Sequence, residues 1–420
     1  MKTKLLWCLL ILTFSSCISH HNDDEEINID PPYHAKVVWR LDTPTLGGHH
    51  YGIQDDNHIY TYENAINVSG EFFLIKINLD TGEILWRSQN IPRAAYCNPV
   101  LADNKVFVLI GSNHIYCFDA SNGYLLAIIQ LGDQNHEYSI NWGLTAYNNF
   151  LYLSFGRADT EYLARLNVID SIDYDNAQTT QLLFPETLFE SMWNSRVGPS
   201  PVIKDNIIYF MTYTGVNKKT TEFVAIRLDT KETVWERLID DDDGSGHLLL
   251  NNNIIHIMGR KIVSANNISN GERIYTRSFP EDIFDDGYYA PGSSINSSRG
   301  SALYNNRFYY TNSNFNINGE YRAPNIVCLE SSNGSTVWGR LAAPESFSMG
   351  VVPVVTNGKV FIPTDNGLEV IDAESGKLLG TDKKLKGYGA GIVFHYNDFI
   401  IFPCREDENY YRYIAVDISE

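Results

Sequence analysis

Seven side chains of types suited to ligand binding each come just before one of a series of similar predicted strands. Two are arginines, Arg196 and Arg299, whose planar guanidinium groups can bind a carboxylate bidentately. Trp142 and Tyr388 could stack on a sugar ring or on a side chain of the same ligand. If the strands surround one axis, these side chains gather at one mouth of a central channel: His50, Tyr96, Trp142, Arg196, His247, Arg299 and Tyr388.

Two interpretations of this set stay open. Aromatic and arginine side chains in a concave place are typical of binding sites, and here they would suit an acidic glycan or an acidic peptide. Alternatively, the aromatic rings pack between neighbouring sheets, and each arginine pairs with a nearby carboxylate. The sequence therefore predicts a ligand site at this mouth without naming the ligand.

The sequence offers no catalytic residue and no metal site that can be assigned. The run Asp240–Asp243 carries oxygen ligands of the kind calcium prefers, but it lacks the spacing of a known calcium loop, and a solvated loop is the alternative. No nucleophile elbow, phosphate loop or zinc motif is present. Carboxylate pairs for glycoside cleavage depend on separation in space and cannot be chosen from sequence.

The elements that would position these residues are short hairpins that occur eight times. Each has two apolar runs joined by two residues drawn from Asn, Asp and Gly, which tolerate the positive φ of a type I′ turn. We expect the turns at Asp56-Asn57, Asp103-Asn104, Asn148-Asn149, Asp205-Asn206, Asn252-Asn253, Asn305-Asn306, Asn357-Gly358 and Asn397-Asp398.

The spacing of these turns predicts a propeller. Successive turns are separated by 47, 45, 57, 47, 53, 52 and 40 residues, close to the length of a four-stranded blade. A third strand, a second turn and a fourth strand with an aromatic residue complete most units. The pattern weakens at Ala127 and Gly380, and residues 171–196 form an insertion whose fourth strand cannot be aligned.

The fold class predicted is therefore all-β, an eight-bladed propeller of four-stranded blades over residues 36–420. Trp39 lies in an apparent fourth strand that has no preceding partners, whereas the last unit has no fourth strand. We expect the N-terminal strand to complete the last blade and close the ring. Residues expected to dock one blade on the next are Trp39, Trp86, Trp235, Trp338, Gly82, Gly123, Gly334 and Gly376.

The first 35 residues are predicted to lie outside the propeller. Lys2 and Lys4 precede a short apolar run from Leu5 to Phe14, as in a secretory signal peptide over residues 1–16. A small residue before Cys17 resembles a bacterial lipoprotein box, so Cys17 would carry the lipid; an ordinary signal with an incidental Cys is the alternative. Removal of the two lysines would change the net charge from −19 to −21.

Residues 17–35 read as a flexible acidic tether, because their composition cannot bury enough apolar surface. The acidic run behind Cys17 resembles export signals of surface lipoproteins in Bacteroidota, and a merely solvated linker is equally compatible. The partners predicted are a membrane, reached through the lipid, and a protein or glycan. The acidic balance excludes nucleic acid, and we expect a monomer. Four cysteines are predicted to be buried free thiols: Cys97, Cys117, Cys328 and Cys404.

The second turn of each unit carries a family resemblance. The segments 79–86 (LDTGEILW) and 370–377 (VIDAESGK) resemble the repeats of quinoprotein-like propellers, whose blades dock through these residues. The resemblance covers residues 36–420. It implies the fold strongly and any activity weakly.

Two branches of that family imply different functions. Pyrroloquinoline quinone (PQQ) dehydrogenases typically have adjacent cysteines beneath the cofactor, a calcium ion and an Asp base; this sequence has no adjacent cysteines. Non-enzymatic propeller lipoproteins, such as that of the outer-membrane β-barrel assembly machine, share the signal, the Cys and the single ring. We therefore expect a non-catalytic, outer-membrane-anchored scaffold without a cofactor, on the periplasmic face or the cell surface. The alternative is a PQQ-dependent oxidoreductase or a carbohydrate-active enzyme that uses the funnel.

Overall fold

The computed structural model contains strands and turns, with no helix, in the residues that it describes. These are residues 33–41, 45–46, 52–64, 71–92, 98–111, 113–133, 136–137, 139–157, 160–177, 179–190, 195–197, 201–214, 221–239, 247–258, 262–278, 301–311, 316–317, 320–321, 326–340, 353–364, 366–387, 393–405 and 410–419.

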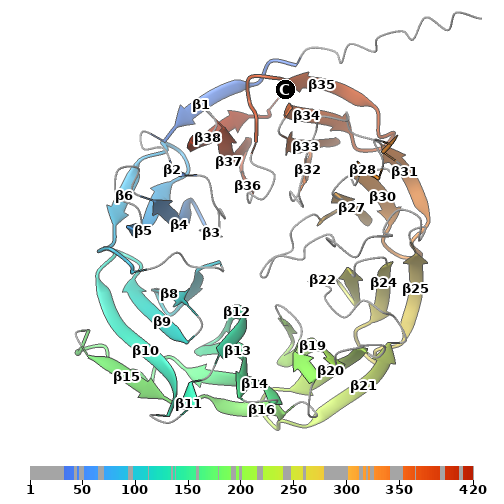
Figure 1. Cartoon of the computed structure of the whole chain (residues 1–420). Helices are drawn as coiled ribbons and strands as arrows, with labels where there is room; N and C mark the ends of the chain where they lie inside the picture. Colours follow the sequence, from blue (N-terminus) through green and yellow to red (C-terminus); the bar gives the residue numbers. More distant parts are fainter. Residues whose placement is uncertain are drawn as a thin grey trace, which may run out of the picture.

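Eight sheets surround one axis and confirm the predicted eight-bladed propeller (Figure 1). Blade 1 contains β3 (Gly52–Asp55), β4 (His58–Asn64), β5 (Phe72–Asn78) and β6 (Ile84–Arg87). Blade 2 contains β7 (Val100–Ala102), β8 (Lys105–Ile110), β9 (His114–Asp119) and β10 (Leu125–Asp133), with additional strands β11 (His136–Glu137) and β15 (Thr180–Leu183). Blade 3 contains β12 (Ser139–Tyr147), β13 (Phe150–Arg157), β14 (Thr160–Asn167) and β16 (Glu186–Glu190).

Blades 4 to 6 follow the same order from the axis outward. Blade 4 contains β17 (Ser195–Val197), β18 (Val202–Lys204), β19 (Ile207–Thr214), β20 (Thr221–Arg227) and β21 (Thr233–Ile239). Blade 5 contains β22 (His247–Asn251), β23 (Ile254–Met258), β24 (Ile262–Asn267) and β25 (Arg273–Ser278). Blade 6 contains β26 (Ser301–Tyr304), β27 (Arg307–Thr311), β30 (Ile326–Glu330) and β31 (Thr336–Arg340).

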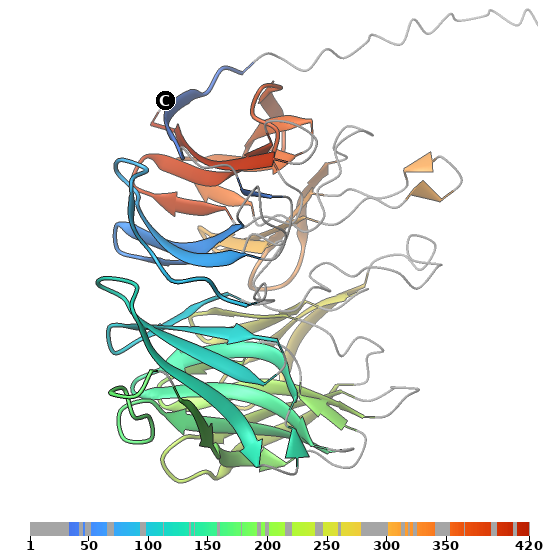
Figure 2. The same ribbon diagram turned by 60° about the vertical axis from the view of Figure 1, so that its left-hand side comes forward.

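The last two blades complete the circle. Blade 7 contains β32 (Val354–Thr356), β33 (Lys359–Thr364), β34 (Gly367–Asp372) and β35 (Leu378–Asp382). Blade 8 contains β36 (Phe394–Tyr396), β37 (Phe399–Arg405), β38 (Tyr410–Asp417) and β1 (Lys36–Arg40), with the short β2 (Thr45–Leu46) also paired to β38. A two-stranded hairpin of β28 (Asn316–Ile317) and β29 (Glu320–Tyr321) lies away from the ring in Figure 2.

The first two strands of each blade are joined at the turns that the sequence predicts. The first turn residue has positive φ in all eight, from 46° at Asp56 to 52° at Asn148. Both central residues have positive φ, as a type I′ turn requires, at Asp103-Asn104, Asp205-Asn206, Asn305-Asn306 and Asn357-Gly358. These turns all lie at one end of the blades, which we call the turn face; the opposite end is the loop face.

The N-terminal strand closes the ring, as predicted. β1 pairs antiparallel with β38, and it forms the outer strand of a sheet otherwise built from the C-terminal strands (Figure 1). Just before β1, Tyr33 N donates to Thr381 O at 3.3 Å, and Ala35 N donates to an Asp382 carboxylate oxygen at 3.0 Å. The chain that enters β1 is therefore already bonded to blade 7.

Buried apolar side chains form clusters between neighbouring blades. One cluster joins Trp39, Tyr413 and Ala415 of blade 8 to Ile59 and Ile75 of blade 1. At the same seam, the Thr61 hydroxyl lies 3.0 Å from the Tyr413 hydroxyl, and burial raises the pKa of Tyr413 to about 12. The core is thus a ring of blade-to-blade contacts, with the buried free thiols Cys117, Cys328 and Cys404 as predicted and Cys97 outside the described residues.

Five seams between blades share one arrangement, in which an aromatic ring of a fourth strand lies on a glycine of the next blade. At Gly82, φ is +73°, and a Cβ atom would lie 2.5 Å from the Trp39 ring, so only glycine fits there. The Trp39 indole N–H also donates to Leu79 O at 2.8 Å. The other pairs in which a glycine with positive φ meets a ring are Gly123 with Trp86, Gly271 with Trp235, Gly334 with Tyr275, and Gly376 with Trp338.

Candidate functional site

Three of the seven predicted mouth residues lie in the innermost strands of the ring. Trp142 is in β12, Arg196 in β17 and His247 in β22. Arg196 pairs with Tyr213, far from the turn at the other end of β19, so its backbone is at the loop face. The other four, His50, Tyr96, Arg299 and Tyr388, lie outside the described residues.

The structure corrects the placement of these three residues relative to the strands. They were expected just before the first strand of a blade, whereas the first strand includes them. The reason is that the second strands are long enough to extend the pairing toward the loop face, as His247 opposite Met258 shows. The expected site at the mouth remains a prediction, as does the pairing of Arg196 with Arg299.

One arginine at the loop face does act as a link within a blade. Arg87 binds Glu63 through two hydrogen bonds, from Nε to Oε2 and from Nη2 to Oε1, the second at 2.9 Å. Glu63 is buried, and its hydrogen bond raises the pKa of Arg87. The second interpretation of the mouth arginines, in which each pairs with a nearby carboxylate, requires an ion pair of this kind. Here such a pair is observed between β4 and β6.

The described residues do not fit the cofactor that the quinone dehydrogenase resemblance implies. Cys117, Cys328 and Cys404 are each buried, on β9, β30 and β37 of three different blades, so they provide no adjacent pair. Among the described residues there is no cluster of three or more His, Cys, Asp or Glu side chains able to hold a metal. Nor does this part of the chain contain a helix long and apolar enough to cross a membrane.

The most irregular part of the ring is the insertion that the sequence could not align. Its first strand, β15, leaves blade 3 and pairs in parallel with β10 of blade 2, with Thr180 opposite Ile128 and Leu183 opposite Leu131. Its second strand, β16, returns to blade 3 and is the missing fourth strand. Blade 2 therefore gains an additional outer strand, which lies outside β10 in Figure 1.

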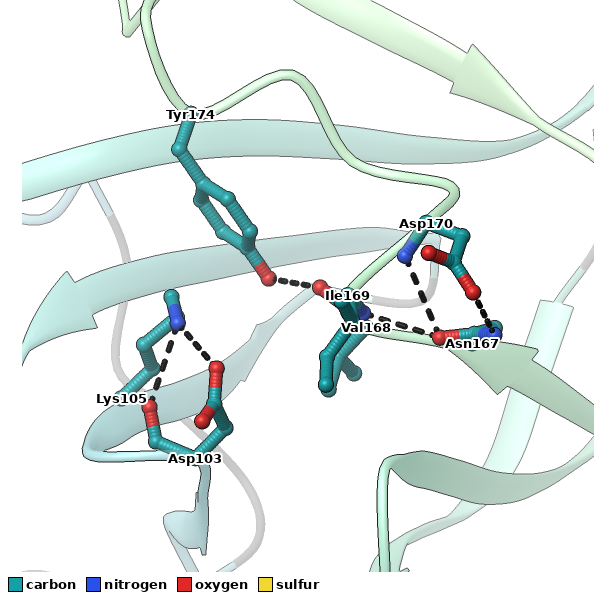
Figure 3. A network of polar contacts seen from close by, with 7 residues as sticks. All are labelled: Asp103, Lys105, Asn167, Val168, Ile169, Asp170 and Tyr174. Atoms are coloured by element: carbon teal, nitrogen blue, oxygen red, sulfur yellow. Dashed lines mark hydrogen bonds and ion pairs between the residues drawn. The ribbon is translucent and has the colours of Figure 1, made fainter.

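The insertion also fills the seam where blade 2 lacks an aromatic residue. Ala127, opposite Cys117 in blade 2, occupies the position that Trp86 occupies opposite Lys76 in blade 1. No indole can therefore reach blade 3 from this position. Tyr174 of the insertion packs against the same cluster, and its hydroxyl donates to Val168 O (Figure 3). Val168 directly follows the third strand of blade 3, as Leu79 directly follows the third strand of blade 1. Val168 O is therefore equivalent to Leu79 O, which accepts the hydrogen bond of the Trp39 indole.

A lysine completes the environment of Tyr174. Lys105 Nζ lies 4.7 Å from the centre of the Tyr174 ring and 2.6 Å from Asp103 Oδ2. Burial raises the pKa of Tyr174, which keeps the hydroxyl protonated as a donor. Figure 3 shows this group beside the turn formed by Asn167 and Asp170, whose side chains hydrogen-bond to each other at 2.8 Å.

The next seam, between blades 3 and 4, has an apolar core like the others but charged side chains at the aromatic and glycine positions. Glu186 stands opposite Arg165 in the strand pairing of blade 3, the same position that Trp86 occupies opposite Lys76 in blade 1.

Lys231 occupies the turn position of Gly82, because its backbone N–H donates to Arg227 O as that of Gly82 donates to Asn78 O. Glutamate thus occupies the aromatic position and lysine the glycine position. Both partners bind the carboxylate of Glu186: Lys231 through Nζ, and Arg165 through Nε at 2.6 Å.

The same seam keeps the acceptor that the indoles use elsewhere. Arg165 Nη1 donates to Leu228 O at 2.8 Å, and Leu228 stands in its turn where Leu79 stands in blade 1. The hydrogen bonds from Lys231 and then Arg165 lower the pKa of Glu186. Lys231 keeps the left-handed conformation, with φ of 61°, that glycine adopts in the other turns.

Comparisons with known proteins agree with this architecture. A family model described as "Outer membrane protein assembly factor BamB" matches residues 26–137. No curated protein sequence gives a significant match.

Three solved structures illustrate the fold. BamB from Moraxella catarrhalis is 11% identical, with 92% of this chain and 99% of that chain covered and a TM-score of 0.57. A europium-containing methanol dehydrogenase is 13% identical, with 88% and 84% covered and a TM-score of 0.61. A quinohemoprotein alcohol dehydrogenase from Comamonas testosteroni is 11% identical, with 92% and 77% covered and a TM-score of 0.62.

Residues 26–137 are similar to the BamB family model, and the ring as a whole has the fold of these solved propellers. At these identities the solved structures establish the ring and leave the chemistry to the individual site. One sequence signal pointed to the irregularity of blades 2 to 4: the absence of an aromatic residue at position 127 required another side chain to fill the seam between blades 2 and 3.

Proposed function

We propose that the protein is a non-catalytic propeller lipoprotein, held at the outer membrane by a lipid on Cys17, which acts as a scaffold for a protein or glycan. The observation that carries this proposal is the match of a family model described as an outer-membrane assembly factor to residues 26–137, on a ring that also resembles BamB. The cofactor test above supports a scaffold over a quinone enzyme, because the chain lacks adjacent cysteines.

The proposed tether would keep the ring near the bilayer. The described chain begins at Tyr33, which is bonded to blade 7, so residues 18–32 would link the lipid to the ring. At about 3.4 Å per residue, this link spans at most about 50 Å. A single acyl anchor binds a membrane weakly, whereas the several chains of a lipoprotein Cys give stable attachment. Both faces of the ring would then be accessible to a partner.

Fractionation of cells tests the anchor. Cys17→Ala should move the protein from the membrane fraction to the soluble fraction of the envelope, whereas Cys8→Ala, a change within the expected signal peptide, should not. If the Cys17→Ala protein remains with membranes after a carbonate wash, the lipoprotein proposal is wrong.

The non-catalytic part of the proposal has its own test. Purified protein is supplied with pyrroloquinoline quinone, calcium and a redox dye in the presence of simple alcohols and sugars. We expect no dye reduction above that of heat-denatured protein. Cofactor-dependent reduction would replace the scaffold with an oxidoreductase.

A further inference from the structure

The additional strand β15 gives blade 2 an outer edge unlike that of the other blades. Its backbone pairs with β10 through residues 128 to 131, and within the described part of the chain no other strand pairs with β15, whose Gln181 side chain hydrogen-bonds to the Asp173 backbone. A strand edge of this kind presents N–H and C=O groups that can pair with an incoming strand.

The side chains on β15 favour such pairing. Along 180–184 they alternate between exposed and partly buried, and the outward set contains Leu182 and Phe184, which are 37% and 62% exposed. Leu183, between them, packs on the core of blades 2 and 3. The exposed apolar residues of β1, β6, β25 and β35 occur singly, as Leu379 does in β35, and the two of β21, Val234 and Leu238, are four residues apart. This edge therefore carries two exposed apolar side chains two residues apart, Leu182 in β15 and Phe184 directly after it.

The segment that carries this edge is acidic. Residues 166–195 contain five acidic side chains and no Lys or Arg. Three cations near this segment are already paired: Lys105, beside Tyr174, with Asp103, and Arg165 and Lys231 with Glu186. Asp173 and Asp175 remain exposed in the loop that leads to β15. A segment that pairs with this edge would meet negative potential, so basic side chains would be attracted.

We propose that the free edge of β15 binds an extended segment of a partner protein, added as a further strand of blade 2. That segment alternates apolar residues, which cover Leu182 and Phe184, with lysine or arginine residues, which face the surrounding carboxylates. Main-chain hydrogen bonds give affinity in this mode, and alternate side chains give specificity. The inference rests on the proposed scaffold function and names the chemistry of one partner.

A peptide selection with purified Cys17→Ala protein tests the proposal. Phage-displayed twelve-residue peptides are selected on the protein, and the enriched sequences are synthesised with a fluorophore. We expect sequences that alternate apolar and basic residues, with an affinity that falls steeply as salt concentration rises. Enrichment of acidic or non-alternating sequences, or no enrichment, would contradict the proposal.

Variants locate the binding. The double variant Leu182→Ser/Phe184→Ser should weaken the selected peptides at least tenfold, whereas Leu379→Ser, a matched exposed leucine on β35, should leave affinity unchanged. All these side chains are exposed, so equal melting temperatures are expected and are measured first. Peptides that bind the double variant as well as the parent protein would place the site elsewhere and overturn the proposal.

Two further measurements separate strand addition from other contacts. N-methylation of alternate peptide residues should abolish binding in one phase, where the N–H groups face β15, and be tolerated in the other; equal effects in both phases would refute strand pairing. A dimer detected by light scattering and lost in the double variant would show that a second copy occupies the edge, which also refutes the proposal. Neither outcome affects the fractionation test of the lipid anchor.

Discussion

The seam between blades 4 and 5 and the seam between blades 3 and 4 use the same backbone positions with opposite chemistry. In the first, Trp235 lies on Gly271, and its indole N–H donates to Ile268 O at 3.0 Å. In the second, Glu186 and Lys231 take these two positions, and Arg165 donates to the corresponding carbonyl. Both seams keep the same backbone carbonyl as a hydrogen-bond acceptor, but different side chains donate to it and pack over it.

This difference shows that the aromatic and the glycine depend on each other. A Cβ atom at Gly271 would lie 2.6 Å from the Trp235 ring, so a ring requires glycine opposite it. Where the ring is absent, a lysine fits at φ of 61° despite the cost of a left-handed conformation. The two positions are therefore expected to change together, and the polar pair leaves a more exposed seam.

Removal of the central side chain should separate the two seams most strongly. Trp235→Ala deletes a buried ring and should lower the free energy of unfolding by about 3–5 kcal/mol. Glu186→Ala removes a carboxylate whose side chain is 43% exposed, and exposed ion pairs contribute roughly 0–1 kcal/mol. Urea denaturation of the two variants measures the difference. Equal losses would show that the charged seam is as important to stability as the aromatic ones.

Exchange of the residue in the left-handed position sharpens the same comparison. Gly376→Ala places a Cβ atom 2.6 Å from the Trp338 ring at φ of +73°, and should cost at least about 1–2 kcal/mol. Lys231→Gly relieves the left-handed strain and loses an exposed ion pair, so its net effect should stay within about 1 kcal/mol. Thermal melts of both variants provide the measurement, and a large loss for Lys231→Gly would contradict this account.

Tyr174→Phe examines the third way of filling a seam. The change removes only the hydroxyl that donates to Val168 O, so the loss should be about 1 kcal/mol. Tyr124→Phe is the matched control, since Tyr124 is 73% exposed and should tolerate the change. If both variants melt like the parent protein, the Tyr174 hydroxyl does not replace the indole donor.

Acid should weaken the polar seam selectively, although by less than the substitutions above. The hydrogen bonds from Lys231 and Arg165 hold the folded-state pKa of Glu186 below its ordinary 4.5. The seam contribution is therefore fully present above pH 4.5 and is lost as pH falls through the lower folded-state value. The stability difference between the parent protein and Glu186→Gln, at most about 1 kcal/mol for so exposed a group, should shrink in acid. A difference that does not change with pH would exclude this ionisation.

Much of the ring could be predicted from sequence because its signals are local. A two-residue turn with positive φ restricts its residues to a few types, so eight turns could be located from Asn, Asp and Gly alone. Closure by the Trp39 strand could be predicted because the first strand had no partners before it and the last unit had no fourth strand. Both predictions depend on short-range chemistry.

The insertion could not be placed because its pairing is not local. Residues 180–183 carry no feature that specifies parallel pairing with β10, some 50 residues earlier in the chain. The exchange at Glu186 and Lys231 was hidden for a similar reason, since the two residues meet only across a seam. The mouth side chains stay a prediction, because the sequence places their backbones near one opening without giving their directions.

The pairing of β1 with β38 has a consequence for how the chain reaches its folded form. Arg412 of β38 donates to Leu41 O at 3.4 Å across a separation of 371 residues, so the ends of the repeat meet only after nearly the whole chain is available. A polypeptide that crosses a membrane with its N-terminus first would hold β1 unpaired while seven blades emerge. Blade 8 would then form last and slowly, as the long loop closure requires. During that interval the surfaces of blades 1 and 7 that pack on blade 8 would be exposed and prone to aggregation.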